Sequence, residues 1–135
     1  MIVAGVMSGT SLDGIDVAIV DIRRERSRLR IEPLAFRSTP YAKSIRESIL
    51  AVSNTMTHTA AISRLNFLLG ELYAEAIQQA SRKSKPELIG LHGQTIFHEG
   101  SSIEYLGRRV ASTLQIGEAA VVAERTGVQI GRAHV

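Results

Sequence analysis

The segment from Gly9 to Asp16 brings two glycines, two hydroxyls and two carboxylates together in eight residues. Glycine lets backbone amides approach a phosphate closely, and the hydroxyls of Thr10 and Ser11 can donate hydrogen bonds to phosphate oxygens. The carboxylate of Asp13 can hold a Mg²⁺ ion through its waters. The segment is therefore predicted to be a loop that binds nucleotide phosphates.

Other known motifs do not fit this segment. Gly9 and Gly14 have the spacing of a Walker A loop, but Ile15 and Asp16 stand where that loop needs Lys and Ser or Thr. The sequence contains no G-x-G-x-x-G, and Ser8 lies in a segment one residue too long for a nucleophile elbow. A β-hairpin whose glycines and aspartates only satisfy the geometry of the turn is the alternative interpretation.

A second polar cluster begins at His92, at the end of the apolar segment 88–92. Gln94 and Thr95 offer donors and acceptors that suit sugar hydroxyls or an acetamide. His92 and His98 lack the i, i+4 spacing of a metalloprotease helix, so they do not predict a zinc site. A packing role and a catalytic role for His92 both stay open.

A third polar segment runs from Thr113 to Gly117, and its Gln115 can face a ligand or cap the end of a strand. Each of the three polar segments adjoins a predicted buried strand. Ligand-binding groups gather at strand ends in α/β folds. We therefore expect the three segments to line one cleft.

Apolar periodicity supplies the elements that must position these segments. Strands are predicted at 2–7, 15–22, 29–36, 88–92 and 111–117, and helices at 40–52, 59–82 and 118–125. Segment 15–22 is apolar on both faces, which predicts a central strand covered on both sides. Pro33 indicates that the strand at 29–36 lies at the edge of the sheet. Gly70 predicts a close approach of its helix to the sheet, and the polar residues 93–95 predict a turn after the strand at 88–92. The order of elements predicts an α/β layer fold.

Size and composition narrow the class of protein. The 135 residues allow one compact domain, and 44% hydrophobic with 21% charged residues is ordinary for a folded chain. The absence of cysteine excludes disulfides and thiolate metal sites. Much of the net charge of +3 comes from Arg23 to Arg30, which has no interleaved aromatics, so a solvated hairpin is favoured over a nucleic-acid surface. With no basic leader and no apolar run of about 20 residues, a cytoplasmic protein without a membrane partner is expected.

Three segments resemble the signatures of anhydro-N-acetylmuramic acid kinases, in this order: Met7 to Asp16, His92 to His98, and Thr113 to Gly117 together with Ala123 to Gly127. The resemblance covers residues 2 to about 128. That family belongs to the hexokinase/actin/heat-shock ATPase superfamily. It implies a ribonuclease-H-like lobe of the α/β class, with a mixed sheet that opens with three antiparallel strands and helices packed on the sheet.

The resemblance also implies an ATP-dependent reaction in bacterial cell-wall recycling. Water opens the 1,6-anhydro bridge of the sugar, and the freed O6 takes the γ-phosphate to give N-acetylmuramic acid 6-phosphate. ATP and Mg²⁺ are the implied cofactors, and a homodimer is possible for the full-length protein. The implied ATP-binding residues are Gly9, Thr10, Ser11, Leu12, Asp13, Gly14, Ile15 and Asp16, and the implied sugar-binding residues are His92, Gln94, Thr95 and Gln115.

Two departures from the family pattern shape the expectation for this chain. The family's general base is the Asp of an Asp-Thr-Gly-Pro segment, expected beyond residue 135, so no catalytic residue is assigned here and the chain alone is expected to be inactive. Residues 1–128 are predicted to be part of an N-terminal kinase lobe. Residues 129–135 do not follow the family's sequence and are predicted to be a non-native tail, so Arg132 and His134 are given no role. A non-catalytic nucleotide-binding module and another sugar kinase of the superfamily are the alternatives.

Overall fold

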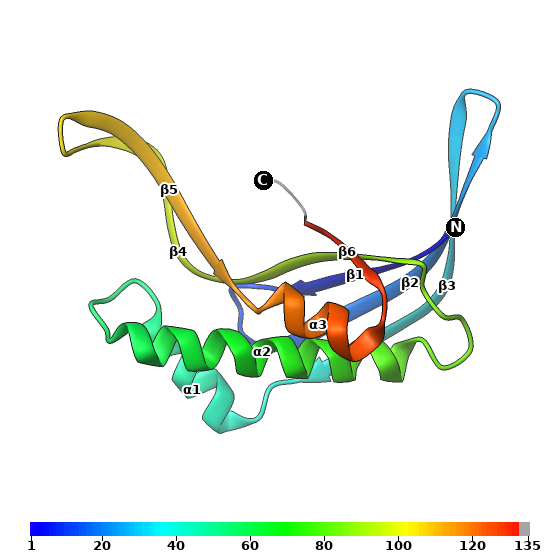
Figure 1. Cartoon of the computed structure of the whole chain (residues 1–135), viewed down its shortest axis with the longest axis horizontal. Helices are drawn as coiled ribbons and strands as arrows, with labels where there is room; N and C mark the ends of the chain where they lie inside the picture. The colour runs from blue at the N-terminus through cyan, green and yellow to red at the C-terminus, as the bar shows by residue number, and fades with distance from the viewer. Residues whose placement is uncertain (133–135) are drawn as a thin grey trace.

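The computed structural model describes residues 1–132 (Figure 1), so His134 lies outside the described residues. Its elements, in chain order, are β1 (Ile2–Ser8), β2 (Gly14–Glu25), β3 (Arg28–Pro40), α1 (Lys43–Val52), α2 (Thr59–Ala80), β4 (Leu88–Tyr105), β5 (Arg108–Ile116), α3 (Ala119–Thr126) and β6 (Gln129–Arg132). Every strand and helix predicted from periodicity is present, with shifted ends. Among these elements, no helix has the length and apolarity needed to cross a membrane.

The strands form one mixed sheet in the order β3-β2-β1-β4-β5, with β6 also paired to β4. The first three strands are antiparallel, whereas β1 and β6 run parallel to β4. β3 lies at the edge of the sheet, as Pro33 indicates. This order, with helices connecting the parallel strands, is the predicted ribonuclease-H-like α/β fold.

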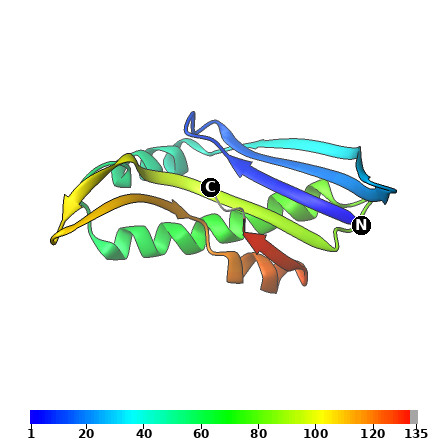
Figure 2. The same cartoon turned by 90° about the horizontal axis from the view of Figure 1, so that it is seen from above.

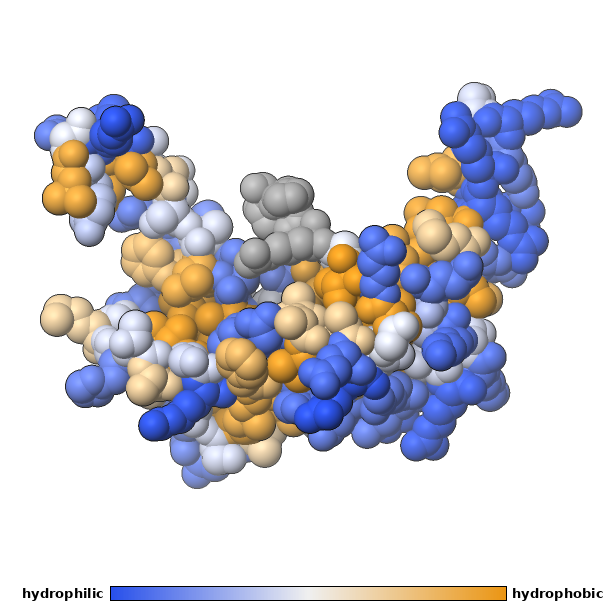
Figure 3. All heavy atoms as spheres, in the orientation of Figure 1, coloured by the Kyte–Doolittle hydropathy of each residue, from blue (hydrophilic) through white to orange (hydrophobic). Residues whose placement is uncertain are grey.

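The described helices cover one face of the sheet, as Figures 1 and 2 show. The long helix α2 packs its apolar side on this face, and the core contains Val17 and Ile19 of β2. On the opposite face of β2, Ala18 and Val20 are only half-buried. The prediction that β2 is covered on both sides is therefore wrong for residues 1–132, because α1, α2 and α3 all lie on the same side. Phe36 of β3 is among the exposed large apolar side chains. Apolar surface is visible near the bases of the two hairpins (Figure 3).

Two local predictions are corrected by the structure. Segment 93–95 is not a turn, because Gly93 takes a positive φ of 87° that absorbs one extra residue and lets β4 continue. Gly70 does not approach the sheet. A Cβ at this position would lie 2.8 Å from the backbone oxygen of Glu118, so the close neighbour is the start of α3.

The β2–β3 and β4–β5 hairpins extend beyond the helices and bend toward the uncovered face (Figure 1). Each contains a register shift, between Ile19 and Val20 in the first and between Thr95 and Phe97 in the second. Such bulges bend strands and increase their twist. The Arg23 to Arg30 segment is exposed at the end of the first hairpin, where the strands continue up to a short turn at 26–27.

β6 pairs with residues 88–91 of β4 through backbone groups. Any sequence without proline supplies those groups. The pairing therefore says nothing about the origin of residues 129–135, and a non-native tail stays a prediction.

Candidate functional site

The predicted phosphate loop connects β1 to β2 and closes with a tight turn, in which the Leu12 amide donates to the Gly9 carbonyl at 3.1 Å. Leu12 has a positive φ of 58° and a buried side chain, so it anchors the loop in the core. Thr10, Ser11 and Asp13 are exposed. Their hydroxyls and carboxylate are therefore available to a ligand, whereas Leu12 has only its backbone to offer.

The two glycines of the loop stand in different surroundings. A Cβ on Gly9 would meet only the Ser11 hydroxyl, at 3.7 Å, so this position is open. A Cβ on Gly14 would lie 2.1 Å from the backbone oxygen of Thr39, so Gly14 lets the end of β3 pass close by. Gly14 is thus required by the fold, whatever it contributes to a ligand.

The rest of the predicted ATP-binding segment lies on β2. Ile15 is buried in the core, and Asp16 is exposed on the neighbouring position, where it accepts a hydrogen bond from the Ser38 hydroxyl of β3. Within residues 1–132, no three His, Asp or Glu side chains are grouped as metal ligands. Mg²⁺ commonly takes only one or two protein carboxylates and keeps several waters. Asp13 fits that mode of binding, and its metal contact stays a prediction.

Four polar side chains from different elements meet beneath the loop. The Ser8 hydroxyl and the Tyr73 hydroxyl of α2 share a hydrogen bond of 2.6 Å, and both side chains are buried. Gln94 of β4 donates from Nε2 to the Gly9 carbonyl at 3.2 Å, and its Oε1 accepts from the Tyr41 hydroxyl at 3.4 Å. Burial raises the pKa of Tyr73 and of Tyr41, because the tyrosinate ion would lose its hydration. The cluster is therefore neutral, and its hydrogen bonds tie the loop to α2 and β4.

β4 is paired on one edge with two strands, and the gap between them opens a pocket. Residues 88–91 pair with β6 and residues 94–105 pair with β5, so His92 and Gly93 fall between the two pairings. A pocket of about 540 Å³ lies here. Its lining comes from α2, β4, the end of β5, the start of α3 and β6: Thr59, Ile62, Ser63, Asn66, Leu91, His92, Gly93, Leu114, Gln115, Ile116, Gly117, Glu118, Ala119 and Ile130.

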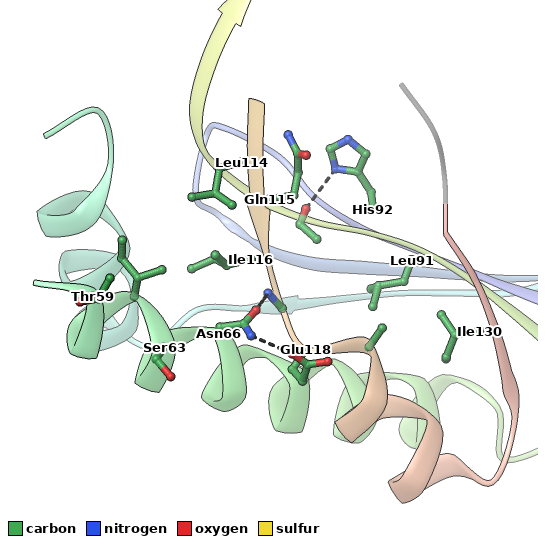
Figure 4. Close-up of a pocket in the computed structure, with 14 residues that line it drawn as sticks. Thr59, Ser63, Asn66, Leu91, His92, Leu114, Gln115, Ile116, Glu118 and Ile130 are labelled. Atoms are coloured by element: carbon green, nitrogen blue, oxygen red, sulfur yellow. Dashed lines mark hydrogen bonds between the residues drawn. The ribbon is translucent and has the colours of Figure 1, made fainter. Parts of the chain in front are cut away.

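The predicted sugar-binding residues are divided between two sides of the sheet. His92 and Gln115 line the pocket and lie on the side of the strands away from α2 (Figure 4). Gln115 donates to the hydroxyls of Thr95 and Thr113, at 3.2 and 2.6 Å, so these groups form one polar cluster. Gln94 instead points into the core and is fully buried. The structure therefore brings Thr95 and Gln115 together, and contact of all four residues with a sugar stays a prediction.

The α2 side of the pocket depends on Asn66, which sequence reasoning missed. Its Oδ1 accepts from the Gly117 amide at 2.6 Å, and its Nδ2 donates to the Glu118 carboxylate at 3.0 Å (Figure 4). Glu118 is the N-cap of α3 and also accepts from the Ala120 amide, as its predicted place at the helix start suggests. A polar residue at a half-buried position of an apolar helix was the only available signal for Asn66.

Comparisons with known proteins agree with the motifs. The family model for anhydro-N-acetylmuramic acid kinase matches residues 1–132. The chain is 47% identical over 133 residues to a protein of Caldanaerobacter subterraneus with that name, and 40% identical over 136 residues to one of Bacillus cereus strain AH820. These alignments cover 94% and 96% of the chain.

The chain spans about a third of the length of these curated relatives, 34% and 35% respectively. Among solved structures, RuvC of Thermus thermophilus aligns over 98% of this chain and 63% of its own, with a TM-score of 0.48 and 12% identity. Since the family model matches nearly the whole length, this chain belongs to the anhydro-N-acetylmuramic acid kinase family.

Proposed function

We propose that this chain provides the phosphate-binding loop and part of the sugar-binding surface of a kinase that converts 1,6-anhydro-N-acetylmuramic acid, ATP and water to N-acetylmuramic acid 6-phosphate and ADP. The observation that carries the proposal is the exposed loop from Gly9 to Asp13, anchored by Leu12 and joined through Gln94 to β4. Membership of the family supports the identity of both substrates.

The charge of the loop favours a phosphate that is already neutralised by a metal. Between Gly9 and Asp16 there are two carboxylates and no Lys or Arg. The Asp13 carboxylate would repel bare phosphate, whereas a Mg²⁺ ion bound to the phosphate oxygens would attract this carboxylate. When bound, Mg²⁺-ATP supplies the phosphoryl group. The hydroxyls of Thr10 and Ser11 would then donate hydrogen bonds to the phosphate oxygens. The Asp13 carboxylate would accept hydrogen bonds from water bound to the metal.

The polar cluster of Thr95, Thr113 and Gln115 is proposed to bind the sugar. Its hydroxyls and amide can donate and accept hydrogen bonds, as sugar hydroxyls and an acetamide require. The step that activates water needs a general base. No residue of this chain is assigned to it, so the isolated chain should bind ligands without turning the sugar over.

Titration of the ¹⁵N-labelled chain with Mg²⁺-ATP, followed by NMR, tests the phosphate loop. Amide signals of residues 9–13 should shift with Mg²⁺-ATP and stay in place with adenosine, because the loop recognises the phosphates. Asp13→Asn should weaken the Mg²⁺-dependent part of the affinity. Equal shifts with adenosine, or none in the loop, would contradict the assignment.

A kinase assay and the gene itself test the larger proposal. The purified chain, mixed with ATP and the anhydro-sugar, should form no phosphorylated sugar, and measurable turnover would contradict its inactivity. Extension of the reading frame past codon 129 to an Asp-Thr-Gly-Pro segment would support the kinase. A stop codon at that point in intact genomic DNA would instead favour a non-catalytic binding module.

A further inference from the structure

We infer that Gln94 is a positioning residue for the phosphate loop: from behind the loop, its side-chain amide holds the Gly9 carbonyl turned toward the protein interior and away from a bound phosphate. The inference rests on the proposed function for its consequence in ligand binding. Its structural part stands on the contacts of Gln94 alone. This role requires no contact between Gln94 and a substrate.

The hydrogen bonds of Gln94 fix the orientation of its amide. The Gly9 carbonyl can only accept, so the group that faces it at 3.2 Å must be the Nε2 donor. Oε1 is then left on the other side, where it accepts from the Tyr41 hydroxyl at 3.4 Å. The Tyr41 hydroxyl can donate or accept, so the contact with the Gly9 carbonyl fixes the orientation of the amide.

The bulge in β4 places Gln94 on the inner face. Leu91 points into the core, and strict alternation would send residues 93 and 95 the same way. The positive φ of Gly93 adds one residue between Val6↔Leu91 and Ser8↔Gln94, which reverses the alternation. Gln94 and Ile96 therefore point inward, and Thr95 faces the open side. One distortion thus places Gln94 behind the loop and Thr95 in the polar cluster.

The Gly9 carbonyl accepts two hydrogen bonds, from Gln94 and from the Leu12 amide. A carbonyl oxygen has two lone pairs, so both are engaged on the protein side. A carbonyl that turned outward would bring a partial negative charge toward phosphate oxygens, in a loop that already carries Asp13. Holding the carbonyl inward removes that repulsion. The loop is then already arranged for the ligand, and no group has to reorient when the ligand binds.

Complete burial makes the contact strong enough for this role. Gln94 has 0% of its surface exposed, so its side-chain amide makes these contacts without competition from water. A residue that only fills the core would lower global stability when replaced. A positioning residue should in addition loosen the loop by itself.

Hydrogen exchange of the Leu12 amide distinguishes these roles. In Gln94→Met, which has similar length and no donor, exchange of this amide relative to a core amide such as that of Val17 should rise about fivefold to tenfold, as expected for the loss of one hydrogen bond. Tyr73→Phe is the matched control, because it removes the hydroxyl bonded to Ser8 in the same cluster and leaves the Gln94 to Gly9 bond intact. In this control the ratio should stay at the wild-type value while global stability falls.

An unchanged ratio in Gln94→Met, or an equal rise in Tyr73→Phe, would overturn the inference. If Gln94→Met does not fold, Gln94→Asn gives the same test with an amide too short to reach Gly9. The affinity for Mg²⁺-ATP, measured by the same NMR titration, should fall about fivefold or more in the Gln94 variant. If the wild-type chain binds no Mg²⁺-ATP, the proposed function is contradicted, and the exchange ratio still decides whether Gln94 positions the loop.

Discussion

The ring of Tyr73 lies so close to Gly117 that a Cβ on the glycine would be 2.3 Å from Tyr73 Cε2. Tyr73 is the same residue that bonds to Ser8 at the start of the phosphate loop. One side chain of α2 therefore contacts both the base of the loop and the end of β5 at the pocket. The turn at Gly117 can follow its path only because the residue has no side chain.

Gly117→Ala should destabilise the fold by about 2–4 kcal/mol, since it combines overpacking against a buried ring with a positive φ of 124°. Gly107→Ala is the matched control. Its φ is 77°, but nothing lies within 4 Å of a Cβ there, so it should cost about 1 kcal/mol. Urea denaturation of both variants measures the difference, and equal losses would argue against the close approach of Tyr73.

The two glycines of the phosphate loop should respond differently to alanine. Gly14→Ala forces a Cβ into the Thr39 carbonyl, so the free energy of unfolding should fall by about 3 kcal/mol or the variant should not fold. Gly9→Ala meets no obstacle in the protein and should keep the wild-type stability within about 1 kcal/mol. Its affinity for Mg²⁺-ATP should nevertheless fall, because the methyl group stands where the phosphates approach. Unimpaired ATP binding by Gly9→Ala would count against this loop as the phosphate site.

Stability should decrease in alkaline solution. Burial raises the pKa of Tyr73 above its ordinary value of 10.0, so the unfolded chain loses this proton at lower pH than the folded chain does. The buried phenol contributes fully to the free energy of unfolding below pH 10, and this contribution is lost as the pH rises above 10. Urea denaturation between pH 7 and 11.5 should show a shallower decline for Tyr73→Phe than for the wild type. Tyr105→Phe, at an exposed site in the second hairpin, should leave the slope unchanged.

Asn66 should be tested with two substitutions that separate its two hydrogen bonds. Asn66→Ala leaves the Gly117 amide without an acceptor and should cost about 1–3 kcal/mol. Asn66→Asp keeps that acceptor but places a second carboxylate next to Glu118. The two like charges repel each other, so the deficit of this variant relative to wild type should shrink as the salt concentration is raised. A deficit that does not depend on salt would contradict this arrangement.

Periodicity predicted the elements of the fold because each depends mainly on its own residues. The segment from Ile2 to Met7 is apolar and bounded by Ser and Gly, and α2 has apolar residues at helical spacing over its whole length. Coverage of β2 was predicted less well. Whether Ala18 and Val20 are covered depends on the face of the sheet against which the helices pack. The sequence of β2 does not determine that face.

The site was predicted in part, for a similar reason. Thr95 and Gln115 stand together as expected, because the pairing of β4 with β5 brings them there. Thr10, Ser11 and Asp13 of the phosphate loop are exposed, and one cleft shared by the loop and this pair stays a prediction. Gln94 was expected on the same side as Thr95 and lies on the other. The bulge at Gly93 decides between the sides, because it shifts the pairing of β4 with β1 so that Gln94 lies opposite Ser8, which is far away in sequence. Helical spacing accounts for the buried ring of Tyr73 on the apolar side of α2, but it gives no information about the partner of its hydroxyl.

The bulges that bend the two hairpins also divide the molecule into parts of unequal cooperativity. Beyond them, residues 23–34 and 100–114 are all exposed, so these outer segments are joined to the rest mainly by their own ladders of hydrogen bonds. They can open while the helices and the inner sheet stay folded. Proteases should therefore cut the two hairpin ends first and leave the loop, the buried cluster and the pocket in one resistant core.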